Sequence, residues 1–83
     1  MDHTDRQYIL ERIAQFIRQE KTGSLTEFAQ KCNLNRDTLF DYIDILRRFT
    51  GRESVKILYD RSRKTYYFSP SGKFTDFKFI RDD

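Results

Sequence analysis

The spacing of the apolar residues changes near the middle of the chain, and this change restricts the possible folds more than any other feature. Before Thr50, apolar residues recur every three or four positions, which is typical of helices that bury one face. From Val55 onward, apolar and polar residues alternate, which is typical of half-buried β-strands. The length of 83 residues leaves room for one domain. The sequence therefore predicts a single α+β domain over 1–83, with the helices first.

The first two helices are predicted from their start signals. Thr4-Asp5-Arg6-Gln7 has the pattern of a capping box, with Thr as N-cap and Gln at the third helical position, and predicts a helix over about 5–20. Ser24-Leu25-Thr26-Glu27 repeats that pattern and predicts a short second helix over about 25–33.

A third helix is predicted over about 36–49, with Asn35 as its N-cap and Thr50-Gly51 at its end. Asn33 stands in the preceding turn, where a left-handed backbone is needed and Asn tolerates it well. The apolar stripes of the three helices give the expected core, which consists of Ile13, Phe16, Phe28, Ala29, Leu34, Leu39, Ile43 and Leu46.

The alternating part of the chain predicts a β-hairpin over about 55–69. Its turn is Arg61-Ser62-Arg63-Lys64, which carries three positive charges. Pro70-Ser71-Gly72 then interrupts the pattern, and one more strand is expected within 74–80.

This last segment carries Phe74, Phe77, Phe79 and Ile80, so that a strand here has apolar residues on both faces. One face then needs a cover. A second copy of the chain is one solution and predicts a homodimer with two-fold symmetry. The alternative is that the segment folds back over the first helix and completes the core of the monomer.

Charge and composition exclude several classes of protein. The net charge is +3, and the basic excess lies in the second half: 52–73 holds six basic and two acidic residues, whereas the first twenty hold three and four. Cys32 and His3 are the only residues of their types, so we expect neither a disulfide nor a zinc site. We also find no nucleophile–base arrangement and no phosphate-binding loop. The expectation is a non-enzymatic, cytoplasmic protein without cofactor, metal or membrane span.

The order of these elements resembles a known family. Residues 24–46, with small Ala29 between the helices and Leu34 in the turn, are similar to the winged helix-turn-helix of bacterial regulators of the DeoR and biotin-repressor type. Ile57-Leu58-Tyr59-Asp60 and Tyr66-Tyr67-Phe68 resemble the wing hairpin of that family, so that the resemblance covers about 24–69. It implies a winged-helix fold and binding to double-stranded DNA, with the third helix in the major groove and the wing on the phosphate backbone.

The resemblance also implies which residues contact DNA. The expected set is Asn35, Arg36, Asp37, Thr38, Phe40, Asp41 and Arg47 around the third helix, and Arg61, Arg63 and Lys64 in the wing. Phe40 has two interpretations, because it either meets thymine methyl groups or a partner, or it is buried by tertiary packing. The third helix is neutral, since Arg36, Arg47 and Arg48 are balanced by Asp37, Asp41 and Asp44.

Two functions are compatible with these features. The first is a transcription regulator that binds DNA as a dimer, which the basic wing favours. The second is a winged helix that binds another protein, with the aromatic C-terminal strand added to the partner's sheet, which the neutral third helix favours.

Overall fold

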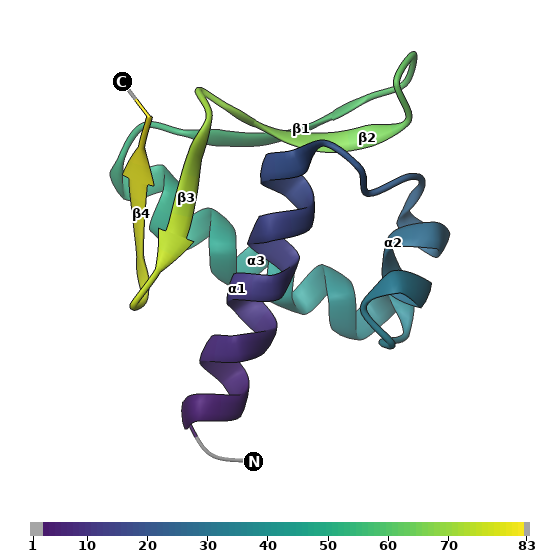
Figure 1. Ribbon diagram of the computed structural model, residues 1–83, viewed down its shortest axis with the longest axis horizontal. Helices are drawn as coiled ribbons and strands as arrows, with labels where there is room; N and C mark the ends of the chain where they lie inside the picture. The colour runs from purple at the N-terminus through teal and green to yellow at the C-terminus, as the bar shows by residue number, and fades with distance from the viewer. Residues whose placement is uncertain (1–2, 83) are drawn as a thin grey trace.

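The computed structural model describes residues 3–82, with side chains from Arg6 onward. This part of the chain forms an α+β fold in which helices precede two β-hairpins (Figure 1). The elements are α1 (His3–Gln19), α2 (Leu25–Lys31), α3 (Arg36–Arg52), β1 (Lys56–Asp60), β2 (Thr65–Ser69), β3 (Gly72–Thr75) and β4 (Lys78–Arg81).

The starts of the first two helices differ in how well they were predicted. α1 begins at His3, two residues before the expected start, so Thr4 lies within the helix and not before it. The side chain of Thr4, and with it the predicted cap, lies outside the described residues. The capping box of α2 is confirmed: the N–H of Glu27 donates to Ser24 Oγ at 3.2 Å, and the N–H of Ser24 donates to Glu27 Oε1 at 3.4 Å.

The turn before α3 is also as predicted. Asn33 has a φ of 57°, and Asn35 caps α3 by accepting the N–H of Thr38 at 2.8 Å. The predicted end of α3 is wrong, because the helix continues to Arg52 and includes Gly51. The left-handed residue that ends it is Ser54, with a φ of 58°, and not the glycine.

β1 and β2 form the predicted hairpin in antiparallel register, with Ile57 opposite Phe68. The carboxylate of Asp60 accepts the backbone N–H groups of Ser62 at 2.9 Å and Arg63 at 3.2 Å, which shapes the turn. At the other side of the sheet, the α1–α2 connection is joined to β2. The N–H of Tyr66 donates to Thr22 Oγ1 at 2.9 Å.

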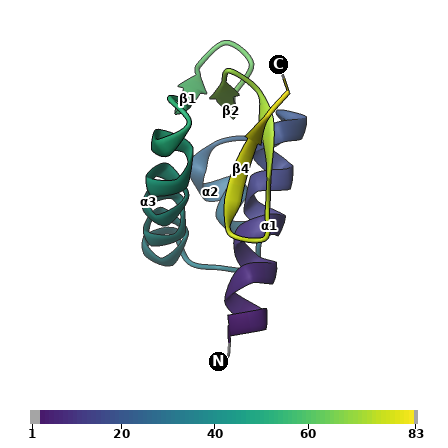
Figure 2. The ribbon, with the colours of Figure 1, turned by 90° about the vertical axis from the view of Figure 1, so that its left-hand side faces the viewer.

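The C-terminal segment is a second hairpin and not the single predicted strand. β3 and β4 pair antiparallel through a two-residue turn, Asp76-Phe77, in which both residues have positive φ values of 52° and 57°. β3–β4 is a separate sheet that lies against α1, as the view in Figure 2 shows.

The core lies between α1, α3 and the two hairpins, and aromatic contacts connect its parts. The rings of Phe68 and Phe79 are 4.8 Å apart, and those of Phe49 and Phe74 are 5.3 Å apart. Phe74 and Phe79 are thus buried within one chain, which is the alternative to cover by a second copy. Of the eight predicted core residues, Phe16 and Leu34 are only half-buried, and the buried ones are Ile13, Phe28, Ala29, Leu39, Ile43 and Leu46.

One glycine in this core has no room for a side chain. Gly72 begins β3 and is buried beneath the ring of Phe79. A Cβ atom at this position would collide with that ring and with the carbonyl oxygen of Ile80. The close approach of the two strands to each other therefore depends on glycine at this position.

Candidate nucleic-acid interface

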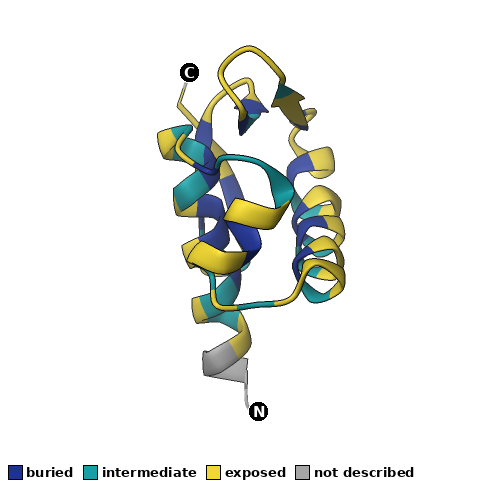
Figure 3. Ribbon diagram, turned by 90° about the vertical axis from the view of Figure 1, so that its right-hand side faces the viewer, coloured by how far each residue is buried: buried dark blue, intermediate teal, exposed yellow. Residues whose placement is uncertain are grey.

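The outward face of α3 is open to solvent along its whole length (Figure 3). Leu39, Ile43 and Leu46 bury one stripe of the helix completely, as their spacing predicted. The exposed residues of the other stripes are Arg36, Asp37, Phe40, Asp41, Asp44, Arg47, Arg48, Gly51 and Arg52. A helix that packs on the core by one stripe and exposes the others to solvent has the shape required to enter the major groove of DNA.

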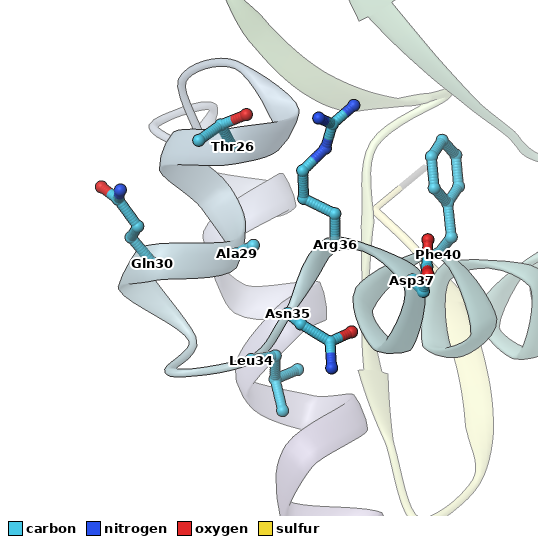
Figure 4. A pocket seen from close by; sticks show the side chains of 8 residues that line it. All are labelled: Thr26, Ala29, Gln30, Leu34, Asn35, Arg36, Asp37 and Phe40. Carbon is cyan, nitrogen blue, oxygen red and sulfur yellow. The ribbon is translucent and has the colours of Figure 1, made fainter.

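An open pocket of about 620 Å³ lies between α2 and the start of α3 (Figure 4). The side chains of Arg36 and Phe40 extend from α3 in the same direction there, toward the β1–β2 hairpin. Among the described residues, Arg36 has no ion-pair partner. The pocket is lined by Thr26, Ala29, Gln30, Leu34, Asn35, Arg36, Asp37 and Phe40.

Two predicted contact residues at the start of α3 have structural tasks. The amide oxygen of Asn35 accepts from the backbone of Thr38, so this oxygen is occupied by the cap. Thr38 itself is half-buried, whereas Asp37 and Asp41 are exposed. Arg36, Asp37 and Asp41 are therefore more accessible to a ligand than Thr38, and Asn35 is exposed but has its amide oxygen occupied.

Phe40 is 44% exposed, and this decides between its two interpretations. The side chain is not part of the buried core, so the alternative of burial by tertiary packing is wrong, and contact with thymine methyl groups or a partner stays a prediction. A large aromatic side chain on the exposed face of a helix marks a surface that suits an apolar contact.

Arg47 connects α3 to the first hairpin. Its guanidinium group donates to Asp44 at 3.3 Å and to the carbonyl oxygen of Ile57 at 3.4 Å. Part of its hydrogen-bonding capacity is thus used within the protein. The contact also shows that this side of α3 faces β1.

The basic residues at the tip of the hairpin differ in whether they form ion pairs. Arg61 and Lys64 are exposed, and neither has an ion-pair partner in the part of the chain that the structure describes. Arg63 is different, because its guanidinium forms ion pairs with Asp60, at 2.8 Å, and with Glu20. It also lies over the ring of Tyr67. Arg63 thus pairs with two carboxylates of the protein, although its side chain remains 52% exposed.

These ion pairs change the acidity of the groups involved. The side-chain hydrogen bond from Arg63 is the largest cause of a lowered pKa at Asp60. The hydrogen bonds to Asp60 and Glu20 in turn raise the pKa of Arg63. Both shifts favour the charged forms, so Asp60 and Arg63 are paired as ions at neutral pH.

Two tyrosines belong to this surface but were not among the predicted site residues. Tyr59 is 38% exposed, and its ring lies 4.8 Å from that of Tyr66. Burial is the largest cause of a raised pKa at Tyr66, with Tyr59 adding to it, while the charges of Arg47 and Arg36 act in the opposite direction. Arg36 and Arg47 of α3 are therefore near this phenol. The signal in the sequence was the alternation of β1, which places Tyr59 on the same face as Ile57.

The tip of the first hairpin, α2 and the start of α3 lie at the same end of the molecule, to the right in Figure 1. The described residues contain no group of His, Cys, Asp and Glu side chains that could hold a metal ion. Within 3–82, none of the helices is long and apolar enough to cross a lipid bilayer. No protein-family model, curated protein or solved structure matches this chain.

Proposed function

We propose that this protein is a transcription regulator that binds double-stranded DNA as a winged helix-turn-helix domain. The main support is the outward face of α3, which is exposed from Arg36 to Arg48 while the opposite stripe is fully buried. In the proposed complex, α3 enters the major groove and the β1–β2 hairpin rests on the phosphate backbone. Such a role places the protein in the bacterial cytoplasm.

The residues divide into base and phosphate contacts. Arg36 is suited to guanine or to a phosphate, and Asp37 and Asp41 to the amino group of cytosine. Arg61 and Lys64 are suited to phosphates on either side of the groove. Arg63 positions the tip through Glu20 and Asp60 and is not itself required to contact DNA.

A homodimer on two half-sites would double the small DNA surface that one copy covers. Phe74 and Phe79 do not contribute to its interface in this proposal, because the protein buries them itself. Ile80 on the outside of β4 is 41% exposed and is the residue of the 74–80 segment best placed for such a contact.

A second candidate function is binding to another protein. The observation that favours it is the near balance of charge on α3, where three aspartates oppose four arginines among the exposed residues of the helix. Carboxylates near phosphates weaken binding to DNA. Leu58, which is 39% exposed on the hairpin, adds an apolar residue that is suited to a protein partner.

The affinity for duplex DNA of random sequence, measured by fluorescence anisotropy over a series of salt concentrations, tests the proposal. Binding through the hairpin predicts that log Kd rises with log salt, with a slope of about one unit per phosphate contact. A slope of zero, or no binding at low salt, would reject DNA binding and leave the protein partner as the better explanation.

A further inference from the structure

The side of α3 that faces the first hairpin carries a combination of residues that duplex binding alone does not require. Arg36, Phe40 and Arg47 are spaced by four and seven residues, so they form one stripe along the helix. Arg47 reaches the carbonyl oxygen of Ile57, which shows that the stripe runs along β1. Phe40 lies between the two arginines on this stripe and is 44% exposed.

The hairpin presents two aromatic rings to this stripe. Tyr59 and Tyr66 are opposite each other in the β1–β2 register, and their rings are in edge contact. The ring of Tyr66 packs against that of Phe28, with 5.9 Å between the ring centroids. The backbone N–H of Tyr66 donates a hydrogen bond to Thr22 Oγ1. Tyr59 is the outer ring of the pair and remains more than a third exposed. We call these five residues, Arg36, Phe40, Arg47, Tyr59 and Tyr66, the aromatic face.

From this arrangement we infer that the aromatic face binds an unpaired base next to duplex DNA, such as a base of a single-stranded overhang. Exposed aromatic rings provide stacking surfaces for bases of any sequence, and arginines beside them bind the phosphates of the same strand. The inference rests on the proposed function, because it needs a duplex on the adjacent outward face of α3.

The chemistry favours a nucleotide over an acidic peptide as the occupant. A peptide that meets the two arginines with carboxylates would lie close to Asp44, which is paired with Arg47 on the same side of α3, and to Asp37 and Asp41. A nucleotide meets the same aspartates, but it gains the stacking energy of its base on Phe40 or Tyr59, which a carboxylate side chain does not have.

Fluorescence anisotropy with three DNA probes tests the inference on the full chain. The probes are a blunt duplex, the same duplex with a short thymine overhang, and the same duplex with an abasic overhang of equal length. The abasic overhang has the same phosphates but no bases, so the ratio of the two overhang affinities measures stacking alone. We expect the thymine overhang to bind about tenfold tighter than the abasic one.

Variants locate the effect. Tyr59→Ala and Phe40→Ala should each reduce this ratio toward one, and Tyr59→Phe should retain it, since the ring persists. Tyr8→Ala is the matched control, because Tyr8 is an exposed tyrosine on α1. Since the ratio is measured within each variant, a general loss of duplex affinity does not disturb it, and thermal melting shows that each variant is folded.

Three results would overturn the inference. Equal affinity for the thymine and abasic overhangs would show that bases are not bound, while binding of the blunt duplex would leave the proposed function intact. A ratio that persists in both alanine variants would place the base elsewhere. Displacement of the thymine overhang by a Glu- and Leu-rich peptide at lower concentration than by free thymine oligonucleotide would assign the face to a protein partner. Failure to bind the blunt duplex would instead reject the proposed function.

Discussion

Glu20, directly after α1, forms an ion pair with Arg63 in the tip of the β1–β2 hairpin. The two residues are 43 positions apart in the sequence, so the contact ties the first helix to the turn of the proposed wing. Glu20 has a φ of 56°, and the left-handed backbone redirects the chain at this point. The contact therefore competes with any phosphate for the same guanidinium group.

We expect Glu20→Gln to strengthen binding to duplex DNA, because it removes one of the two carboxylates that pair with Arg63 and leaves only Asp60 to compete with the phosphates. The slope of log Kd against log salt should become steeper by about one unit. Glu53→Gln is the matched control, since it removes the same charge from the exposed end of α3. An equal change of slope in both variants would mean that only net charge matters.

The three basic residues of the tip should respond differently to removal. Arg61→Ala and Lys64→Ala should each weaken binding to all duplex sequences alike and lower the salt slope by about one unit. Arg63→Ala should leave the slope unchanged, since its guanidinium is already paired with carboxylates. A loss of slope in Arg63→Ala equal to that in Lys64→Ala would contradict the assignment of Arg63 as a positioning residue.

The pH dependence of the hairpin follows from Asp60. Its pKa is lowered in the folded protein, so the charged carboxylate stabilises the fold above its ordinary pKa of about 4, and this stabilisation is lost as the pH falls through the lower folded value. A carboxyl titration by NMR should give a midpoint below the ordinary value. Arg63→Ala, which removes the largest cause, should return the midpoint toward it, and a midpoint that stays low would point to the backbone N–H groups instead.

Leu39→Ala and Ile43→Ala should each cost about 2–5 kcal/mol of stability, because both side chains are completely buried on the inner stripe of α3. Phe40→Ala removes a larger side chain from the exposed face of the same helix and should change stability little. Thermal unfolding followed by circular dichroism compares the three. A loss in Phe40→Ala as large as in Leu39→Ala would show that Phe40 is packed.

The second hairpin permits folding and association to be tested separately. Phe79→Ala should destabilise the monomer by about 3–5 kcal/mol, since the ring packs on Phe68 and covers Gly72. Ile80→Asp should leave the melting temperature nearly unchanged, because the side chain is exposed. If a dimer forms through β4, sedimentation should show that Ile80→Asp is monomeric, and an unchanged dimer would place the interface on another surface.

Local signals in the sequence predicted the parts of the fold that are fixed locally. The capping box at Ser24, the N-cap at Asn35 and the left-handed turn at Asn33 each depend on residues within a few positions of one another. The stripe of Leu39, Ile43 and Leu46 was predicted for the same reason. The end of α3 was predicted three residues too early. The helix continues through Gly51 to Arg52, and the left-handed residue that follows it is Ser54.

The parts that the sequence did not reveal depend on distant partners or on unusual turn residues. Asp76 and Phe77 adopt positive φ values although neither is glycine. In the sequence, the turn between β3 and β4 therefore looked like the middle of a strand. The pairing of Arg63 with Glu20 joins two segments that no local pattern connects. The exposed stripes of α3 could thus be predicted from local periodicity, whereas the ion pairs of Arg63 and the contact between Tyr59 and Tyr66 depend on tertiary structure.

The lack of space around Gly72 restricts which residues a homologous chain can carry at this position. A homologous chain that retains the second hairpin has to retain glycine at this position, because any side chain would force the two strands apart. The ring of Phe79, seven residues later, should be retained together with it, since the ring occupies the space that the missing Cβ leaves. Distant relatives should thus be traceable by this pair of positions after the remaining surface has diverged.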